Sequence, residues 1–463
     1  MIPHSILTSC AVLLAESRWW RTVFGVALAV LGSVSSFLSA PAAEEMREHT
    51  LSNGLQVVLV EDHWHPLAAL EVCYRAGSRY DPAGKQGLAH LLEHLTFRSL
   101  GLPHEEEAPP SEAGKRARAT TKHDTTCYSH RLLRAQMESV LAAEAARMAT
   151  LQMSVEDLEH EKAIVIQERR QFVEGDTWRN LLEEVDSIAF RLHPYRFPAS
   201  GWPETLQHIT LDDVQRHFTA LYAPANAILV AVGDFHSAEL LARIETHFGK
   251  IPARALPVQA PTVESAQAGE RRLSFAPWAA PRMVYAYHVP AFGSLDTSAL
   301  EVVSTLLSGA ATARLPTLLY PHHLAENEGI EYLPLTQDPS LFYIKVALGP
   351  QVNFRLTGEA IDDVLWHLRE DGLHPEELEQ AKKRLLLDFY LNRSLGTRAE
   401  RLAQYGVLAA LPQAQRYTGE LQAVTAADVQ RVVRSYFSPD NRVIGITGVA
   451  HQEGVREHQG EAR

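Results

Sequence analysis

The stretch LDDVQRHFTALYAPANAILVAVG, residues 211–233, has a counterpart later in the chain, AADVQRVVRSYFSPDNRVIGITG, residues 426–448. The two stretches align without a gap at a spacing of 215 residues, and each predicts a helix, a proline-containing turn and an apolar strand. A duplication on this scale indicates two similarly folded domains. Because strand-like and helical runs do not alternate regularly, we expect the α+β class.

The domain limits are predicted from composition. Residues 44–254 are the expected N-terminal domain, residues 269–455 the C-terminal domain, and residues 456–463 a tail. The Pro- and Ala-rich residues 255–268 are the expected linker. A hydrophobic content of 46% suffices for sizeable cores, and the net charge of −13 argues against nucleic acid as a partner.

The N-terminus has the pattern of a secretory signal peptide. Arg18 and Arg21 precede an apolar run over residues 22–38, followed by small residues with an Ala-x-Ala-like end, so we expect residues 1–43 to be removed. The alternative is a membrane anchor formed by residues 22–38, since ~20 residues span a bilayer. We expect an exported protein, most simply periplasmic, without a stable membrane span after cleavage.

Two of the three cysteines, Cys73 and Cys127, belong to the predicted mature chain and lie in strand-like stretches. We expect them to be small buried apolar residues, because cysteine is among the most buried residue types. An exported compartment would also permit a disulfide, so their pairing stays open.

The candidate metal ligands lie in GLAHLLEHLTFRS, residues 87–99. Residues 88–100 are mainly apolar and contain neither Gly nor Pro, which predicts a helix. His90 and His94 lie one turn apart on the same face of this helix and can bind one zinc ion, with Glu93 next to a metal-bound water. The H-x-x-E-H pattern occurs in zinc hydrolases, although an amphipathic helix with a polar outer face is the alternative.

A third ligand must come from elsewhere in the chain. Residues 154–172 predict a long polar helix with Ser154 as its N-cap. The helix carries Glu161 and Glu168, which lie two turns apart on one face. Seen alone, they are ordinary surface glutamates. At the corresponding place in the second copy, residues 299–307 contain no histidine, so only one half is expected to carry metal chemistry.

With these motifs, the chain resembles the inverzincin, or pitrilysin/insulinase-type (M16-like), metallopeptidases over essentially the whole mature chain, and most closely their mitochondrial-processing-peptidase-like members. The resemblance implies that His90, His94 and Glu168 bind one zinc ion per chain, that Glu93 is the general base, and that Glu161 is a supporting carboxylate. It also implies two homologous domains in tandem, each a mainly antiparallel sheet packed with helices. Further matching motifs are residues 124–128 (DTTCY), 193–195 (HPY) and 222–226 (YAPAN).

Two departures from the family pattern concern substrate binding. The family usually has an Asn-Ala pair beside the active site, where this chain has Arg118 and Ala119. The pair opens a stretch, residues 119–132, that we expect to be one strand. The family's second half also carries an arginine and a tyrosine, seven residues apart, that contact bound peptide. In this chain Tyr332 stands at the tyrosine position, and Ala325 stands at the arginine position. Arg118, Ala119 and Tyr332 are therefore candidate substrate contacts, and packing is the alternative for Tyr332. We expect a dimer, formed either by two copies of this chain or with a homologous subunit that supplies the missing arginine.

The resulting prediction is an exported zinc metalloendopeptidase that hydrolyses short or unfolded peptides. Its substrate would add as a strand to a sheet edge near residues 119–128. The alternative is a catalytically silent scaffold or partner subunit of a peptidase complex. Manganese or cobalt could also bind two histidines and a carboxylate, so the physiological metal stays open.

Overall fold

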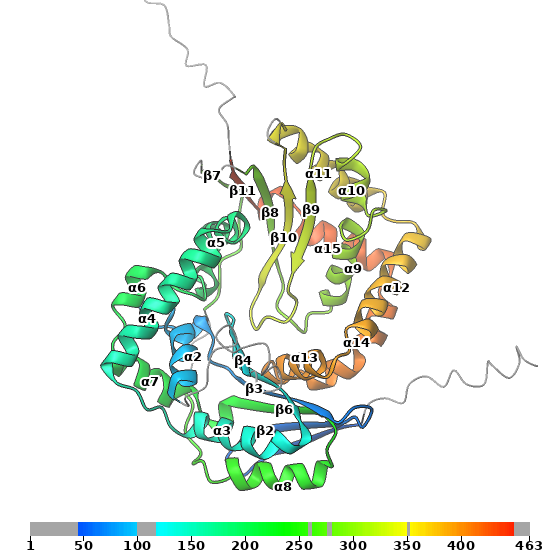
Figure 1. Cartoon of the computed structure of the whole chain (residues 1–463). Helices are drawn as coiled ribbons and strands as arrows, with labels where there is room; N and C mark the ends of the chain where they lie inside the picture. Colours follow the sequence, from blue (N-terminus) through cyan, green and yellow to red (C-terminus); the bar gives the residue numbers. More distant parts are fainter. Residues whose placement is uncertain (1–44, 100–116, 258–261, 276–279, 350–351, 449–463) are drawn as a thin grey trace, which may run out of the picture. The chain divides into compact units, whose positions relative to one another are not determined.

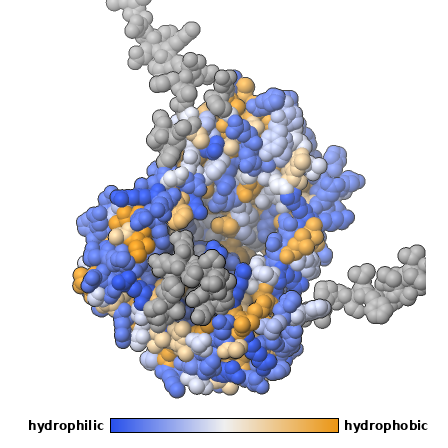
Figure 2. Space-filling model, in the orientation of Figure 1, coloured by the Kyte–Doolittle hydropathy of each residue, from blue (hydrophilic) through white to orange (hydrophobic). Residues whose placement is uncertain are grey.

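The computed structural model describes residues 45–99, 117–257, 262–275, 280–349 and 352–448 (Figure 1). The predicted signal peptide and C-terminal tail lie outside these residues. No helix in the described part of the chain combines the length and apolar character needed to cross a bilayer. On the face shown in Figure 2, hydrophilic residues predominate and apolar residues form only separate patches.

The first half builds a six-stranded sheet in the order β1-β2-β6-β3-β5-β4. All neighbouring strands are antiparallel except β2 and β6, which are parallel. The strands are β1 (Met46–Thr50), β2 (Gln56–Glu61), β3 (Leu67–Tyr74), β4 (Ala117–Thr121), β5 (Thr126–Leu133) and β6 (Ala227–Gly233). The helices are α2 (Leu88–Ser99), α3 (Met137–Ala149), α4 (Val155–Arg169), α5 (Thr177–Ala189), α6 (Pro203–Gln207), α7 (Leu211–Leu221) and α8 (Ser237–Phe248).

The second half builds a five-stranded sheet in the order β7-β11-β8-β10-β9, again antiparallel except for one pair, β7 and β11. The strands are β7 (Arg271–Phe275), β8 (Arg282–Val289), β9 (Asn327–Tyr332), β10 (Ser340–Ala347) and β11 (Arg442–Thr447). The helices are α9 (Thr297–Leu307), α10 (Arg314–Leu319), α11 (Phe354–Glu370), α12 (Pro375–Leu391), α13 (Leu395–Val407), α14 (Leu411–Ala423) and α15 (Ala426–Tyr436). The predicted α+β class, with mainly antiparallel sheets, is confirmed.

The repeated stretches fold alike. α7 and α15 both begin with a capping box, in which a threonine and an aspartate three residues later bond each other's backbone N–H groups. After each helix, an asparagine donates its side-chain N–H to a carbonyl of the helix end, Asn226 to Leu221 and Asn441 to Tyr436, each at 2.8 Å. The duplication predicted from the sequence is therefore a structural repeat.

Each half also contributes one helix to the sheet of the other half. α5 packs on β8 and β11, and α13 packs on β3 and β6. A glycine allows each close approach: a Cβ at Gly445 in β11 would collide with Val185 of α5, and one at Gly406 in α13 would collide with Ile228 of β6.

The stretch of residues 119–132 forms two strands, so the prediction of one strand is wrong. The chain reverses at residues 122–125, where the Lys122 N–H donates to the Thr125 carbonyl at 2.8 Å. The buried Asp124 holds this turn by accepting hydrogen bonds from the Tyr195 hydroxyl at 2.7 Å and from Arg79 at 2.9 Å. These long-range polar contacts outweigh the β-propensity of the neighbouring threonines. β4 lies at one edge of the six-stranded sheet.

Cys73 and Cys127 are buried as predicted, but they are also joined by a disulfide. The register of β3 and β5 places them directly opposite each other, with a Cα–Cα distance of 4.1 Å. The sequence left this pairing open, because it depends on strand register, which the spacing of the cysteines does not reveal.

Candidate metal centre

α2 carries the H-x-x-E-H motif, as predicted, and its start is fixed by Asp81. The Asp81 carboxylate accepts hydrogen bonds from the backbone N–H groups of Gly87 at 2.7 Å and Ala89 at 2.9 Å. These are groups that a helix start otherwise leaves unsatisfied. Burial raises the pKa of Asp81 to about 8. The apolar face of α2 lies in the main core, and the helix packs beside α4 (Figure 1).

His90, His94 and Glu168 converge at the contact between α2 and α4. A carboxylate oxygen of Glu168 lies 3.3 Å from His94 Nε2 and 3.9 Å from His90 Nε2. One ligand atom from each of the three residues lies within 4.8 Å of the others. Two imidazole nitrogens and one carboxylate oxygen form a donor set that suits zinc, with a coordination position left open for chemistry. The residues present therefore fit the metal that the sequence predicts.

Glu93 lies beside these ligands and is 7% exposed. Burial raises the pKa of its carboxyl group, although the neighbouring His94 and the Thr121 hydroxyl partly oppose this shift. Thr121, at the end of β4, donates a hydrogen bond of 2.5 Å to Glu93 Oε2. Sequence analysis missed Thr121, because nothing in the local pattern of β4 shows that its end faces α2.

Glu161 occupies the position of a supporting carboxylate. Its side chain is almost fully buried, and Oε2 lies 3.5 Å from His94 Nδ1, on the opposite edge of the ring from Glu168. Arg98 contacts Glu161 Oε1 at 3.4 Å. Although burial favours the neutral imidazole, the bonds to Glu161 and Glu168 raise the pKa of His94 to about 10. A carboxylate on the second ring nitrogen orients a ligating histidine and increases its basicity.

A buried polar network supports the inner face of α2. The Thr96 hydroxyl lies 2.8 Å from the Tyr128 hydroxyl and accepts a hydrogen bond from Arg147 at 3.1 Å. Arg147 also forms a fully buried ion pair with Glu144 on the same helix, and its guanidinium lies 4.1 Å from the centre of the Tyr128 ring. This network was not predicted. A threonine in an otherwise apolar helix face was its only sequence signal.

The predicted substrate contacts lie on two edge strands. Arg118 is exposed and Ala119 is half-buried on β4, the strand that also carries Thr121. Tyr332 ends β9, and its half-buried ring lies 5.4 Å from that of Phe342. Tyr332 thus packs on the core of the second half.

α9 is the counterpart of α2, and its buried positions match those of α2 at a shift of 211 residues. His90, Glu93 and His94 then correspond to Glu301, Ser304 and Thr305. α12 corresponds to α4 at a shift of 220 residues. Lys162 and Lys382 each donate to a backbone carbonyl four residues before the repeated stretch, those of Gln207 and Gln422. Glu161 and Glu168 therefore correspond to Ala381 and Asp388. The second half lacks the metal-binding set.

Comparisons with known proteins agree with this geometry. Residues 56–201 match the insulinase (peptidase family M16) domain, and residues 208–385 match the peptidase M16 inactive domain. The chain is 27% identical over 400 residues to the zinc protease PqqE of Helicobacter pylori, covering 84% of this chain and 89% of that protein. It is 26% identical over 226 residues to a probable mitochondrial-processing peptidase subunit beta of Arabidopsis thaliana, covering 48% of this chain and 41% of that one.

Among solved structures, a protease from Helicobacter pylori matches with a TM-score of 0.81 and 26% identity, over 87% of this chain and 99% of that one. The first match ends just before α6 and the second begins directly after it, so all five residues of the candidate centre lie within the first match. The insulinase-type domain thus carries the candidate metal-binding set, and the inactive-type domain carries its altered counterpart. The chain belongs to the insulinase (M16) family of peptidases.

Proposed function

We propose that this protein is an exported zinc metalloendopeptidase that cuts short or unfolded peptides. The observation that supports it most strongly is the convergence of His90, His94 and Glu168 beside a buried glutamate, Glu93, that is held by Thr121. A zinc ion at this place would supply Lewis-acid chemistry, polarising the scissile carbonyl and lowering the pKa of the attacking water. We expect one such ion per chain.

Glu93 is the proposed general base. Its Oε2 is engaged by Thr121, which leaves Oε1 to accept a proton from the attacking water. The same carboxyl group then returns the proton to the leaving amine nitrogen. Burial raises the pKa of Glu93, and this makes its carboxylate a stronger base than an exposed one.

We propose that the substrate binds along β4. Among the described residues, β4 is an edge strand of its sheet, so one side of its backbone can pair with an extended peptide. Such pairing places the peptide next to Thr121 and Glu93, and it selects unfolded segments, because the backbone groups of a folded protein are already paired. Arg118 and Ala119 would contact the peptide from this strand. We also propose a dimer. In it, a homologous subunit supplies the peptide-binding arginine, which this chain replaces with Ala325.

The test uses the chain from residue 44 onward, purified with its zinc content measured. It is incubated with an unfolded polypeptide such as reduced casein and, separately, with a compact folded protein, and the products are identified by mass spectrometry. We expect internal cuts in the unfolded substrate only, abolished by 1,10-phenanthroline and restored by added zinc. Cuts confined to the chain ends would contradict endopeptidase action. A zinc-loaded chain that cuts nothing, alone or with co-purified partners, would favour the silent scaffold.

A further inference from the structure

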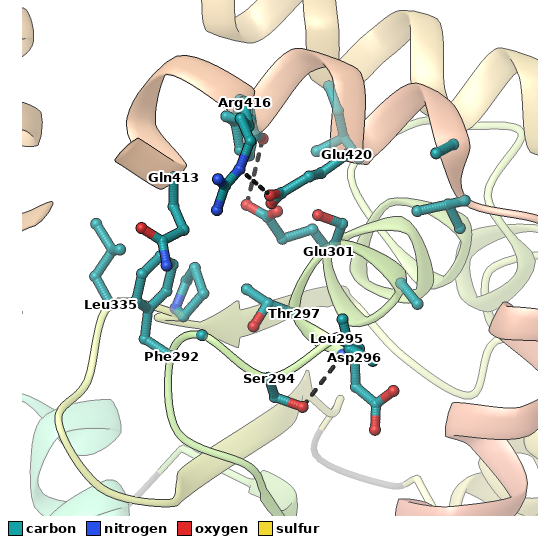
Figure 3. A pocket seen from close by; sticks show the side chains of 18 of the residues that line it. Phe292, Ser294, Leu295, Asp296, Thr297, Glu301, Leu335, Gln413, Arg416 and Glu420 are labelled. Atoms are coloured by element: carbon teal, nitrogen blue, oxygen red, sulfur yellow. Dashed lines mark hydrogen bonds and ion pairs between the residues drawn. The ribbon is translucent and has the colours of Figure 1, made fainter. Parts of the chain in front are cut away.

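The second half contains a cavity of about 900 Å³ at the place that corresponds to the metal centre. It is lined by α9, α12, α13, α14 and α15 and by the loops before α9 and after β9 (Figure 3). Glu301 and Asp388, the counterparts of His90 and Glu168, both line it. The cavity therefore occupies the site that holds the catalytic residues in the first half, with a different set of side chains.

Glu301 lines this cavity with a half-buried side chain. One oxygen accepts a hydrogen bond of 3.3 Å from the Tyr417 hydroxyl. The other, Oε2, is buried and has no hydrogen-bond partner among the described residues. A buried polar atom without a partner is unfavourable, and a bound water, ion or ligand is one way to satisfy it. Burial raises the pKa of Glu301 to about 7, although Tyr417 and Arg401 favour its ionised form.

The remaining lining favours a cation attached to an apolar group. Three arginines line the cavity, and each already has a partner: Arg401 lies over the Phe389 ring at 4.3 Å, Arg416 pairs with Glu420 at 3.2 Å, and Arg431 pairs with Asp296 at 2.6 Å. The wall next to Glu301 is largely aromatic, formed by Phe292, Phe389, Tyr405 and Tyr417. Aromatic faces and a carboxylate together attract ammonium groups.

A second zinc ion does not suit the cavity. The counterpart of His94 is Thr305, and no imidazole lines the walls. Within the described residues, three groups of His, Cys, Asp and Glu converge closely enough to bind a metal, and none includes Glu301. The carboxylate at this site therefore needs a partner that donates hydrogen bonds.

We propose that the cavity binds a primary ammonium group on an apolar stem, with Glu301 as its counter-ion and the aromatic rings around the stem. The ammonium donates to both the free Oε2 and the oxygen shared with Tyr417. Two sources have this chemistry, a small free amine and a lysine side chain of a peptide. This binding is independent of the metal centre and of peptide hydrolysis.

The first test compares three probes of similar shape by isothermal titration calorimetry at pH 8, where Glu301 is mostly ionised. The probes are 2-phenylethylamine (cation), 2-phenylethanol (neutral) and 3-phenylpropanoate (anion). We expect the amine to bind at least tenfold more tightly than the alcohol, and the anion most weakly. Because the comparison uses the unaltered chain, it does not depend on whether any variant folds. Equal binding of all three probes, or tightest binding of the anion, would overturn the proposal.

The second test assigns the amine site to Glu301. Glu301→Gln keeps the shape of the side chain, so we expect it to weaken 2-phenylethylamine at least tenfold and to leave 2-phenylethanol unchanged. Glu359→Gln, at an exposed ion pair on α11, is the matched control and should bind both probes as the wild type does. Unchanged amine binding by Glu301→Gln would contradict the proposal.

The third test separates the two sources. N-acetyl-Ala-Lys-Ala-amide is compared with its norleucine analogue and with n-pentylamine, using the same measurement. Tighter binding of the lysine peptide than of pentylamine, lost in the norleucine analogue, identifies a lysine side chain. Binding of pentylamine alone identifies a small free amine. Failure of both amines to bind would overturn the proposal, and the casein assay remains a separate measure of peptidase function.

Discussion

α2 and α9 occupy corresponding places in the two halves, and they pack in the same way against corresponding helices. α2 presents His90, Glu93 and His94, whereas α9 presents Glu301, Ser304 and Thr305 at the same positions. Both helices keep a fully buried apolar face. The fold thus accepts either set of side chains. The histidines and glutamate of α2 are not needed for packing, and their presence together indicates function.

The partner helices differ in the same way. Glu161 and Glu168 on α4 correspond to Ala381 and Asp388 on α12, while the lysine that fixes the helix is kept in both halves. This structural lysine contact is thus present in both halves, whereas the residues proposed to bind the metal occur in the first half only. The predictions below test this division, from the largest expected effect to the smallest.

The largest contrast is expected between His94→Ala and Thr305→Ala, which truncate corresponding side chains. His94→Ala removes a ligand, so bound zinc should be lost. Because a bound metal contributes several kcal/mol to transition-state stabilisation, kcat/KM should fall on the order of 10³-fold. Thr305→Ala should change neither quantity. Zinc content by mass spectrometry and peptide hydrolysis provide the readout, and similar effects of both variants would contradict the division between the halves.

His217 in α7 corresponds to Val432 in α15, within the repeated stretch. Burial lowers the pKa of His217 from 6.5 to about 4, and its Nε2 is buried without a partner among the described residues. In the unfolded chain, His217 takes up a proton more readily than in the folded one. Its neutral form therefore contributes stability above pH 6.5, and this contribution is lost as the pH falls through 6.5 toward 4.

We expect the loss to reach about 3 kcal/mol of unfolding free energy. His217→Val, which copies the second half, should abolish this part of the pH dependence. Urea unfolding of the metal-free proteins at pH 7, 5.5 and 4.5 measures it. Parallel stability curves for the variant and the wild type would show that His217 is not buried in its neutral form.

Glu161 is expected to strengthen the metal site through His94 without binding the metal. Glu161→Gln keeps the size of the side chain but removes its charge, so metal affinity should fall by about 10–100-fold. Competition with a chelator of known affinity gives the measurement. Glu156→Gln, exposed at the start of the same helix, is the control. Complete loss of zinc would instead identify Glu161 as a direct ligand.

Substitution of Thr121 should have the smallest of these effects, a reduction of kcat. Thr121→Val removes one hydrogen bond to Glu93, which is worth about 1.5–3 kcal/mol when the acceptor is charged. We expect kcat to fall about tenfold or more, with zinc content unchanged, and Thr121→Ser to restore it. A loss that serine does not restore would indicate that the shape of the β4 end matters, and that the hydroxyl does not.

The α2 part of the site could be predicted because its signals are local. The spacing of His90 and His94 predicts one helix face, and Ser154 predicts the start of α4. The roles of Glu161 and Glu168 followed only from the resemblance to the family. Thr121 and the buried Arg147 were missed and the pairing of Cys73 stayed open, because each depends on contacts between segments distant in the chain. The turn at residues 122–125 was also missed, since Asp124 is fixed by partners that no local pattern reveals. The packing of α5 and α13 on the sheet of the opposite half was not predicted for the same reason.

The most direct test of the central claim measures zinc content and turnover together in Glu93→Gln. Glu93 binds no metal in this account, so the variant should keep one zinc ion per chain and a similar KM. Its kcat should fall about 10²–10⁴-fold, the range for loss of a general base. Ser304→Ala, at the corresponding position of α9, should behave as the wild type. Retained turnover in Glu93→Gln, or loss of its zinc, would contradict the assignment of Glu93 as the base beside the metal.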